Sequence, residues 1–272
     1  MCAYARIAGA GASSAIDAPH DSRDNGRMSH STFTRADGVP LAYRHTPGAG
    51  PTLVFLPGYM SDMEGGKALA LQAWAEARGQ AMLRLDYSGC GASGGRFEDG
   101  TLDLWRDDVL ALVDALTSGP LVLVGSSMGG WLMLLAALAR PERVTGIVGI
   151  AAAPDFTRWG FTDSQKAVIA EKGRLEETSE YSDEPYVTTL GFWRSGESNL
   201  LLDSAIPLDC PVRLLHGQRD EDVPWQTSLK LADALASADV HVTLVKDGDH
   251  RLSRTEDIAL LIGATERLLE GL

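Results

Sequence analysis

Three features are scarce in this chain of 272 residues, and each scarcity excludes a class of protein. Cys2, Cys90 and Cys210 are the only cysteines, which are too few and too scattered for a disulfide framework or a zinc cluster. No run of about 18 apolar residues occurs, so we expect no stable membrane insertion. Lysine and arginine number 24 against 37 acidic residues, and a net charge of -13 makes nucleic acid a poor partner.

The first 28 residues also lack features that targeting segments carry. They are rich in Ala, Gly and Ser but contain no continuous apolar stretch of the kind found in secretion signals. Asp17, Asp21 and Asp24 argue against a mitochondrial transit peptide, which is poor in acidic residues. We expect residues 1–28 to be a disordered tail, with Met28 as a plausible true start, and we expect a cytoplasmic location, with a mitochondrial one as the alternative.

Beyond the tail, short apolar runs alternate with helical patterns. Residues 31–46 read as a hairpin around the turn dipeptide Asp37-Gly38. Apolar runs of strand length alternate with amphipathic or apolar helical stretches, an order typical of a mostly parallel, doubly wound sheet. The predicted strands include 51–59, 80–89, 120–127, 144–154, 210–217 and 240–250, and the predicted helices include 68–79, 101–116, 129–140 and 225–236. We therefore predict one α/β domain over residues 29–272.

Residues 155–208 interrupt this alternation. The segment is polar but contains several large aromatic side chains, so we predict a short helical lid over the carboxyl edge of the sheet. Its aromatic residues are candidates for contact with substrate, although each could equally pack within the lid itself. The four that we single out are Trp159, Phe161, Phe192 and Trp193.

A nucleophile motif lies between the strand at 120–127 and the helix at 129–140. Residues 125–129, GSSMG, fit the pattern G-x-S-x-G, which alone recurs by chance. Its position between a strand and a helix is typical of a sharp turn that exposes the central serine. We predict Ser127 as the nucleophile and interpret Ser126 as a turn residue.

A serine hydroxyl needs a base, and the base needs an orienting acid. His250 follows the last strand and is the predicted base, whereas His216 is badly placed to bridge an acid and the serine. Asp220 follows another strand end and is the predicted acid, with Asp222 as its rival. The order Ser, Asp, His along the chain is that of α/β-hydrolases.

The same scheme needs two backbone N–H donors for the oxyanion that forms during acyl transfer. Met128 follows the nucleophile and supplies one, and Tyr59 follows the bend at Pro57-Gly58 and supplies the other. Asp247, Asp249 and His250 lack the spacing of a metal site, so we predict neither a metal nor another cofactor.

Several stretches resemble one family of serine hydrolases, known as mycophenolic acid acyl-glucuronide esterase or palmitoyl-protein thioesterase. The likeness spans residues 53–272 and fades in the insertion. It rests on FLPGYMSDMEGGKALAL, LRLDYSGCGASGG, LVGSSMGGWLMLLAALARPERV, CPVRLLHGQRDEDVPW and DGDHRL. The resemblance implies a cofactor-free α/β-hydrolase for acyl esters or thioesters, with a triad at Ser127, Asp220 and His250.

The predicted function is therefore hydrolysis of carboxylic esters or acyl-thioesters through an acyl-enzyme on Ser127. The substrate is expected to be a small molecule or an acylated protein. A peptidase of the same fold and a non-catalytic small-molecule receptor remain as alternatives, and the sequence leaves the oligomeric state open.

Overall fold

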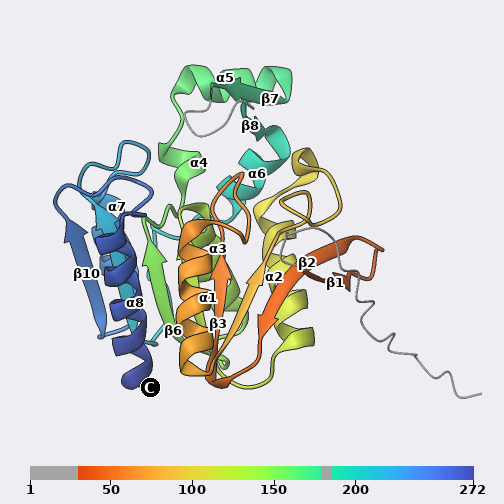
Figure 1. Ribbon diagram of the computed structural model, residues 1–272. Helices are drawn as coiled ribbons and strands as arrows, with labels where there is room; N and C mark the ends of the chain where they lie inside the picture. The colour runs from red at the N-terminus through yellow and green to blue at the C-terminus, as the bar shows by residue number, and fades with distance from the viewer. Residues whose placement is uncertain (1–29, 179–184) are drawn as a thin grey trace, which may run out of the picture.

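The computed structural model describes residues 30–178 and 185–272, and an eight-stranded sheet forms its centre (Figure 1). The strand order is β1-β2-β4-β3-β5-β6-β9-β10. β2 is antiparallel to both β1 and β4, and all other neighbours are parallel, as predicted. The strands are β1 (Ser31–Thr34), β2 (Pro40–Thr46), β3 (Ala49–Leu56), β4 (Gln80–Leu85), β5 (Leu121–Ser126), β6 (Val144–Ile150), β9 (Val212–Gly217) and β10 (Val240–Val245). The predicted tail, residues 1–28, lies outside the described residues.

Helices cover both faces of this sheet, which explains why the central strand β5 is buried at every residue (Figure 1). α1 (Gly66–Arg78) and α8 (Thr255–Glu270) contribute to one apolar core. α2 (Leu102–Leu116), α3 (Met128–Ala139) and α7 (Gln226–Ala234) contribute to the other. A short 3₁₀ turn, η1 (Phe97–Asp99), precedes α2. The ten residues that open α3 are all buried, so this helix is held on every side.

The predicted lid forms a cap beyond the end of β6 (Figure 1). Its helices are α4 (Phe156–Trp159), α5 (Asp163–Lys172) and α6 (Leu190–Ser198). Its two strands, β7 (Arg174–Glu177) and β8 (Tyr186–Thr189), pair in antiparallel fashion, a small sheet that the helical prediction lacked. The pairing is visible only in tertiary structure, because each strand is four residues long.

Hydrogen bonds of Asp155, at the start of the cap, link it to the segment that follows α6 at the end of the cap. Its buried carboxylate accepts hydrogen bonds from the backbone N–H groups of Leu201 and Leu202, each at 2.8 Å. Burial raises the pKa of Asp155, against the lowering effect of those two hydrogen bonds. The cap therefore begins and ends at one point of the fold.

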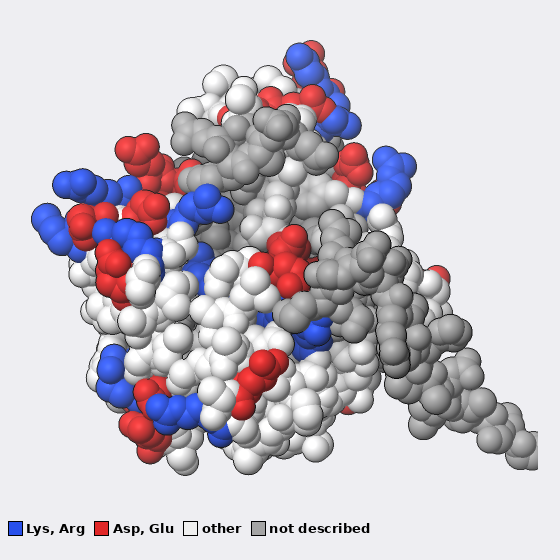
Figure 2. Space-filling model, viewed as in Figure 1, with Lys and Arg blue, Asp and Glu red and all other residues white. Residues whose placement is uncertain are grey.

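Among the described residues, acidic and basic side chains are intermingled on the face seen in Figure 2. Among residues 30–178 and 185–272, no helix has both the length and the apolar character needed to cross a bilayer.

Candidate active site

Ser127 occupies the single residue between β5 and α3, with φ of 54° and ψ of -122°. These angles lie outside the regions that non-glycine residues prefer, so the turn is strained. Three backbone hydrogen bonds hold it. The N–H of Ser127 donates to Ile150 at 2.9 Å, and its carbonyl accepts from Gly130 at 2.8 Å and from Ala153 at 3.1 Å.

Two glycines make this turn sterically feasible. A Cβ atom at Gly125 would lie 2.4 Å from the carbonyl oxygen of Gly129. One at Gly129 would lie 2.1 Å from the carbonyl oxygen of Leu56, at the end of β3. The motif therefore contains glycine because the neighbouring backbone passes too close for any side chain.

His250 connects Ser127 to Asp220 by hydrogen bonds at both ring nitrogens. Its Nε2 lies 3.1 Å from Ser127 Oγ, and its Nδ1 lies 2.8 Å from Asp220 Oδ2. An ionised carboxylate only accepts, so Nδ1 carries a proton and Nε2 is free to accept one from the serine. The structure thus brings together the three residues that the sequence predicts, from loops after β5, β9 and β10.

Asp220 is enclosed by donors. Its Oδ1 accepts from the backbone N–H groups of Asp222 at 2.9 Å and Val223 at 2.8 Å, and its side chain is fully buried. Burial raises the pKa of Asp220, but hydrogen bonds from His216 and His250 outweigh it and hold the pKa well below its usual range. The carboxylate is therefore charged at neutral pH, whereas its rival Asp222 is exposed.

Tyr59 and Met128 line the same cavity as Ser127 and His250, which has a volume of about 730 Å³. Met128 is the first residue of α3, so its N–H has no acceptor within the helix and contributes to the partial positive charge of the helix N-terminus. Neither N–H donates a hydrogen bond within the described part of the chain. Both amides are thus free to serve an oxyanion.

The cap aromatics divide into two groups. Trp159 and Phe161 line the cavity, together with Met60, Phe156 and Tyr186, which the sequence analysis did not select. The other two predicted contacts lie away from it. Phe192 is only 1% exposed and packs among aromatic rings, while the indole of Trp193 donates to the Thr157 carbonyl at 3.2 Å. The structure does not bring Phe192 and Trp193 to the cavity, because α6 packs Phe192 against Tyr59 and Trp105 of the sheet domain and directs the Trp193 indole to Thr157 within the cap.

The Tyr59 side chain has a second role that the motif did not reveal. Its ring lies 4.7 Å from that of Phe192 and 5.9 Å from that of Trp105, measured between centroids. Its hydroxyl donates to the Val187 carbonyl on β8 at 2.6 Å. Tyr59 therefore joins the cap to the sheet domain through its side chain, and its backbone N–H is the predicted second oxyanion donor.

Charged residues also line the cavity, most of them from the sheet domain. The lining includes Asp62, Lys67, Glu177, Asp222 and Arg251. The Lys67 ammonium donates to the Arg251 carbonyl, and burial lowers the pKa of Lys67 to about 8. The cavity thus combines a largely apolar wall from the cap, to which β7 adds Glu177, with a polar wall from the sheet domain.

Asp220, Asp222 and His250 also offer three potential metal-ligand atoms within 4.8 Å of one another. Both nitrogens of His250 are already engaged, one by Asp220 and one by Ser127. A metal ion at this position would have to displace one of these hydrogen bonds. The donor set fits a proton relay better than a metal centre.

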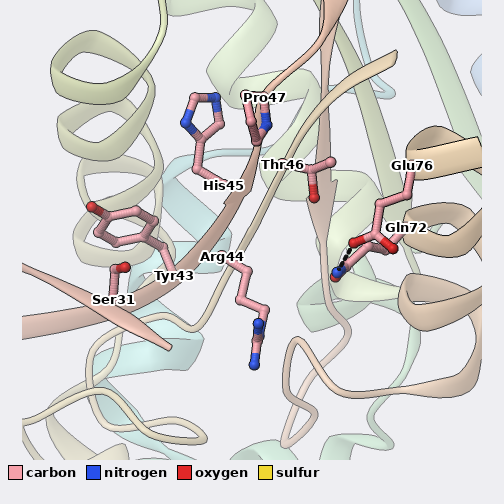
Figure 3. A pocket seen from close by; sticks show the side chains of 8 residues that line it. All are labelled: Ser31, Tyr43, Arg44, His45, Thr46, Pro47, Gln72 and Glu76. Atoms are coloured by element: carbon pink, nitrogen blue, oxygen red, sulfur yellow. Dashed lines mark hydrogen bonds between the residues drawn. The ribbon is translucent and has the colours of Figure 1, made fainter. Parts of the chain in front are cut away.

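A second hollow, of about 410 Å³, lies between β2 and α1 (Figure 3). Gln72 Nε2 donates to Glu76 Oε1 at 2.6 Å on one side, while Arg44 extends away from this pair. Ser31 and His45 also line it, but no hydrogen bond joins them in the described residues. This hollow has no activated nucleophile of the kind found at Ser127.

Comparison with protein families and curated proteins identifies relatives. Residues 51–167 match the family described as alpha/beta hydrolase fold. The mitochondrial palmitoyl-protein thioesterase ABHD10 of Homo sapiens is 44% identical over 250 residues, which cover 90% of this chain and 82% of the human protein. ABHD10 of Mus musculus is 45% identical over 251 residues, covering 90% and 84%.

Solved structures agree. The alpha/beta hydrolase domain-containing protein 10 from mouse superimposes with a TM-score of 0.84 at 43% identity, covering 90% of this chain and 99% of that one. A putative hydrolase from Agrobacterium vitis S4 gives 0.84 at 40% identity, covering 89% and 98%.

These relatives correct one expectation. The prediction of a cytoplasmic location is wrong, because the well-covered ABHD10 relatives are named as mitochondrial proteins. The prediction rested on three aspartates in residues 1–28, and that segment carries none of the similarity described above for residues 53–272.

The fold, the cavity with its serine and the extent of these similarities agree with one another. The chain belongs to the ABHD10 family of α/β-hydrolases and is a serine hydrolase of esters or thioesters.

Proposed function

We propose that this enzyme removes medium or long acyl groups from thioesters, including those on acylated proteins, through an acyl-enzyme on Ser127. The observation that carries the proposal is the hydrogen-bond chain from Ser127 through His250 to Asp220. Palmitoyl-protein thioesterase is the name of its ABHD10 relatives, and the apolar cap wall suits a hydrocarbon chain.

Catalysis begins when Ser127 Oγ attacks the acyl carbonyl while His250 Nε2 accepts the hydroxyl proton. The carbonyl oxygen becomes an oxyanion, which accepts hydrogen bonds from the backbone N–H groups of Tyr59 and Met128. The tetrahedral adduct then breaks its bond to the thiolate or alkoxide, which leaves with the proton from His250. Asp220 keeps the imidazole in the required tautomer throughout.

Water completes the cycle by the same route. His250 accepts a proton from the water as its oxygen attacks the acyl-enzyme, and the proton then passes to Ser127 Oγ as the acyl–serine bond breaks. The products are a free carboxylic acid and the released thiol or alcohol, and no cofactor takes part in the balance.

Chain length provides the test. Acyl thioesters and matched esters from acetyl to octanoyl should show kcat/KM rising with length, by a factor that reflects up to about 0.8 kcal/mol per buried methylene. Thioesters should be the better substrates at each length. A flat or falling series would contradict the acyl-chain assignment, and absence of a product burst together with resistance to a serine-reactive phosphonate would contradict the acyl-enzyme itself.

A further inference from the structure

A second histidine contacts the acid of the proposed triad. His216 is the penultimate residue of β9, four residues before Asp220, and both side chains are fully buried. Its Nε2 lies 3.1 Å from Asp220 Oδ2, the oxygen that also accepts from His250 Nδ1 at 2.8 Å. Two imidazoles therefore share one carboxylate oxygen, and the proposed mechanism uses only one of them.

The partners of His216 determine where its proton lies. Nε2 faces Asp220 Oδ2 and also the Val223 carbonyl oxygen at 3.0 Å, and both of these groups only accept. Nε2 therefore carries a hydrogen that it shares between them. Nδ1 lies 2.7 Å from Ser228 Oγ on α7, a hydroxyl that donates to it when the ring is neutral.

We infer that His216 is a positioning residue that holds the Asp220 carboxylate in place by donating a hydrogen bond from Nε2 to Oδ2. This inference rests on the proposed function. The backbone N–H groups of Asp222 and Val223 hold Oδ1, and His216 holds Oδ2, so the carboxylate cannot rotate. The chain Ser228–His216–Asp220 thus ties the orientation of His250 to the packing of α7 on β9.

The same hydrogen bond affects the pH dependence of the reaction. A neutral donor on Oδ2 offsets part of the negative potential that Asp220 exerts on His250. Without that donor, the protonated form of His250 is favoured more strongly. Because the reaction needs neutral His250, the acidic limb of the kcat/KM profile then moves to higher pH.

Other charged groups near His250 stay constant in this comparison. Asp222 lies in the same loop as Asp220, and Asp249 and Arg251 flank His250 in the sequence. The other charged residues that line the cavity are Asp62, in the loop before α1, Lys67, in α1, and Glu177, in β7. Replacing His216 alters none of them, so a shift in the acidic limb reports the contact with Asp220.

The test compares His216→Phe with His216→Gln in the full chain. Phenylalanine keeps a flat buried ring but has no donor, whereas glutamine presents an N–H near the position of Nε2. We expect H216F to lower kcat per active site by about 10- to 100-fold with KM little changed, because the acid and base lose their alignment. We expect its acidic limb to rise by about half a pH unit or more, and H216Q to restore most of both properties.

The control is His241→Phe, the same change at a 69% exposed histidine on β10, which should match the wild type. Active sites are counted with a phosphonate, so loss of folded protein does not count as loss of kcat. An H216F enzyme with wild-type kcat and an unshifted acidic limb overturns the inference, and so does an H216Q enzyme as impaired as H216F.

If H216F fails to fold, ¹⁵N-detected spectra of the wild-type imidazoles decide, with H216Q identifying the His216 signals. A ring proton on Nε2 at all pH values at which the protein is folded supports the inference, and a neutral ring protonated only on Nδ1 overturns it. A different result would contradict the proposed function itself, namely a Ser127→Ala enzyme that keeps its activity.

Discussion

The turn at Ser127 and the cap above it reach the same cavity by different physical means. The turn is local: its unusual backbone angles are held by hydrogen bonds to Ile150, Gly130 and Ala153 and by glycines with no room for a Cβ atom. The cap is assembled from short elements whose aromatic side chains pack on one another and on Tyr59. Chemistry thus depends on a rigid backbone, and substrate fit depends on side-chain packing, which a sequence can vary more freely.

The largest effect should come from the turn itself. Ser127→Ala should remove the acyl-enzyme and leave only about 10³- to 10⁴-fold acceleration over water, from the oxyanion donors and binding. Ser126→Ala, one residue earlier, is the matched control and should keep most of the turnover. Steady-state kinetics on both variants, with thermal unfolding to verify folding, measure this. Equal losses in the two variants would remove Ser127 from the role of nucleophile.

The acid loop should show the next largest contrast. Asp220→Asn should lower kcat by about 10⁴-fold, as loss of the acid does in a well-studied triad, because the amide favours the wrong tautomer of His250. Asp222→Asn removes an exposed carboxylate and should change kcat little. The pair is compared by kcat per phosphonate-titrated site. If the order of the two effects were reversed, the acid would have to be Asp222.

Within the cap, substitution of one aromatic residue should mainly lower the stability of the protein, and substitution of another should mainly change its selectivity for acyl chain length. Phe192→Ala removes a ring that is 1% exposed and should cost about 3–5 kcal/mol of unfolding free energy. Trp159→Ala opens the cavity wall and should flatten the dependence of kcat/KM on acyl chain length, with a smaller loss of stability. Denaturant titration and the thioester series measure the two properties. If both variants lost the same stability and the same chain-length dependence of kcat/KM, the buried and the cavity-lining aromatic residues would have the same role.

The smallest effect concerns Lys67 on the polar wall. Burial lowers its pKa to about 8 from the 10.5 of the unfolded chain, so between these values the unfolded state binds more protons. Stability of the wild type should therefore rise with pH across this window relative to Lys67→Met. The exposed Lys230→Met serves as control. A difference between wild type and K67M that stays constant from pH 7 to beyond the window would show that Lys67 is not desolvated.

The sequence by itself determined the fold class and the members of the proposed triad. Alternating apolar runs predict a parallel sheet because buried strands need apolar residues on both faces, and the loops after parallel strands meet at one edge. Ser127, Asp220 and His250 each follow a strand, so their approach could be foreseen from their order. Tyr59 and Met128 could be located similarly, because each follows a turn with a recognisable pattern.

Tertiary structure alone decided which cap aromatics face the cavity and which groups surround the acid. Trp159 and Phe161 differ from Phe192 and Trp193 in the direction that the folded cap gives their side chains, and no local pattern specifies that direction. The position of His216 in the chain argues against it as the base, and only the fold shows that it contacts Asp220. Backbone constraints act over a few residues and leave a sequence signature, whereas side-chain packing between distant segments depends on how the whole chain closes.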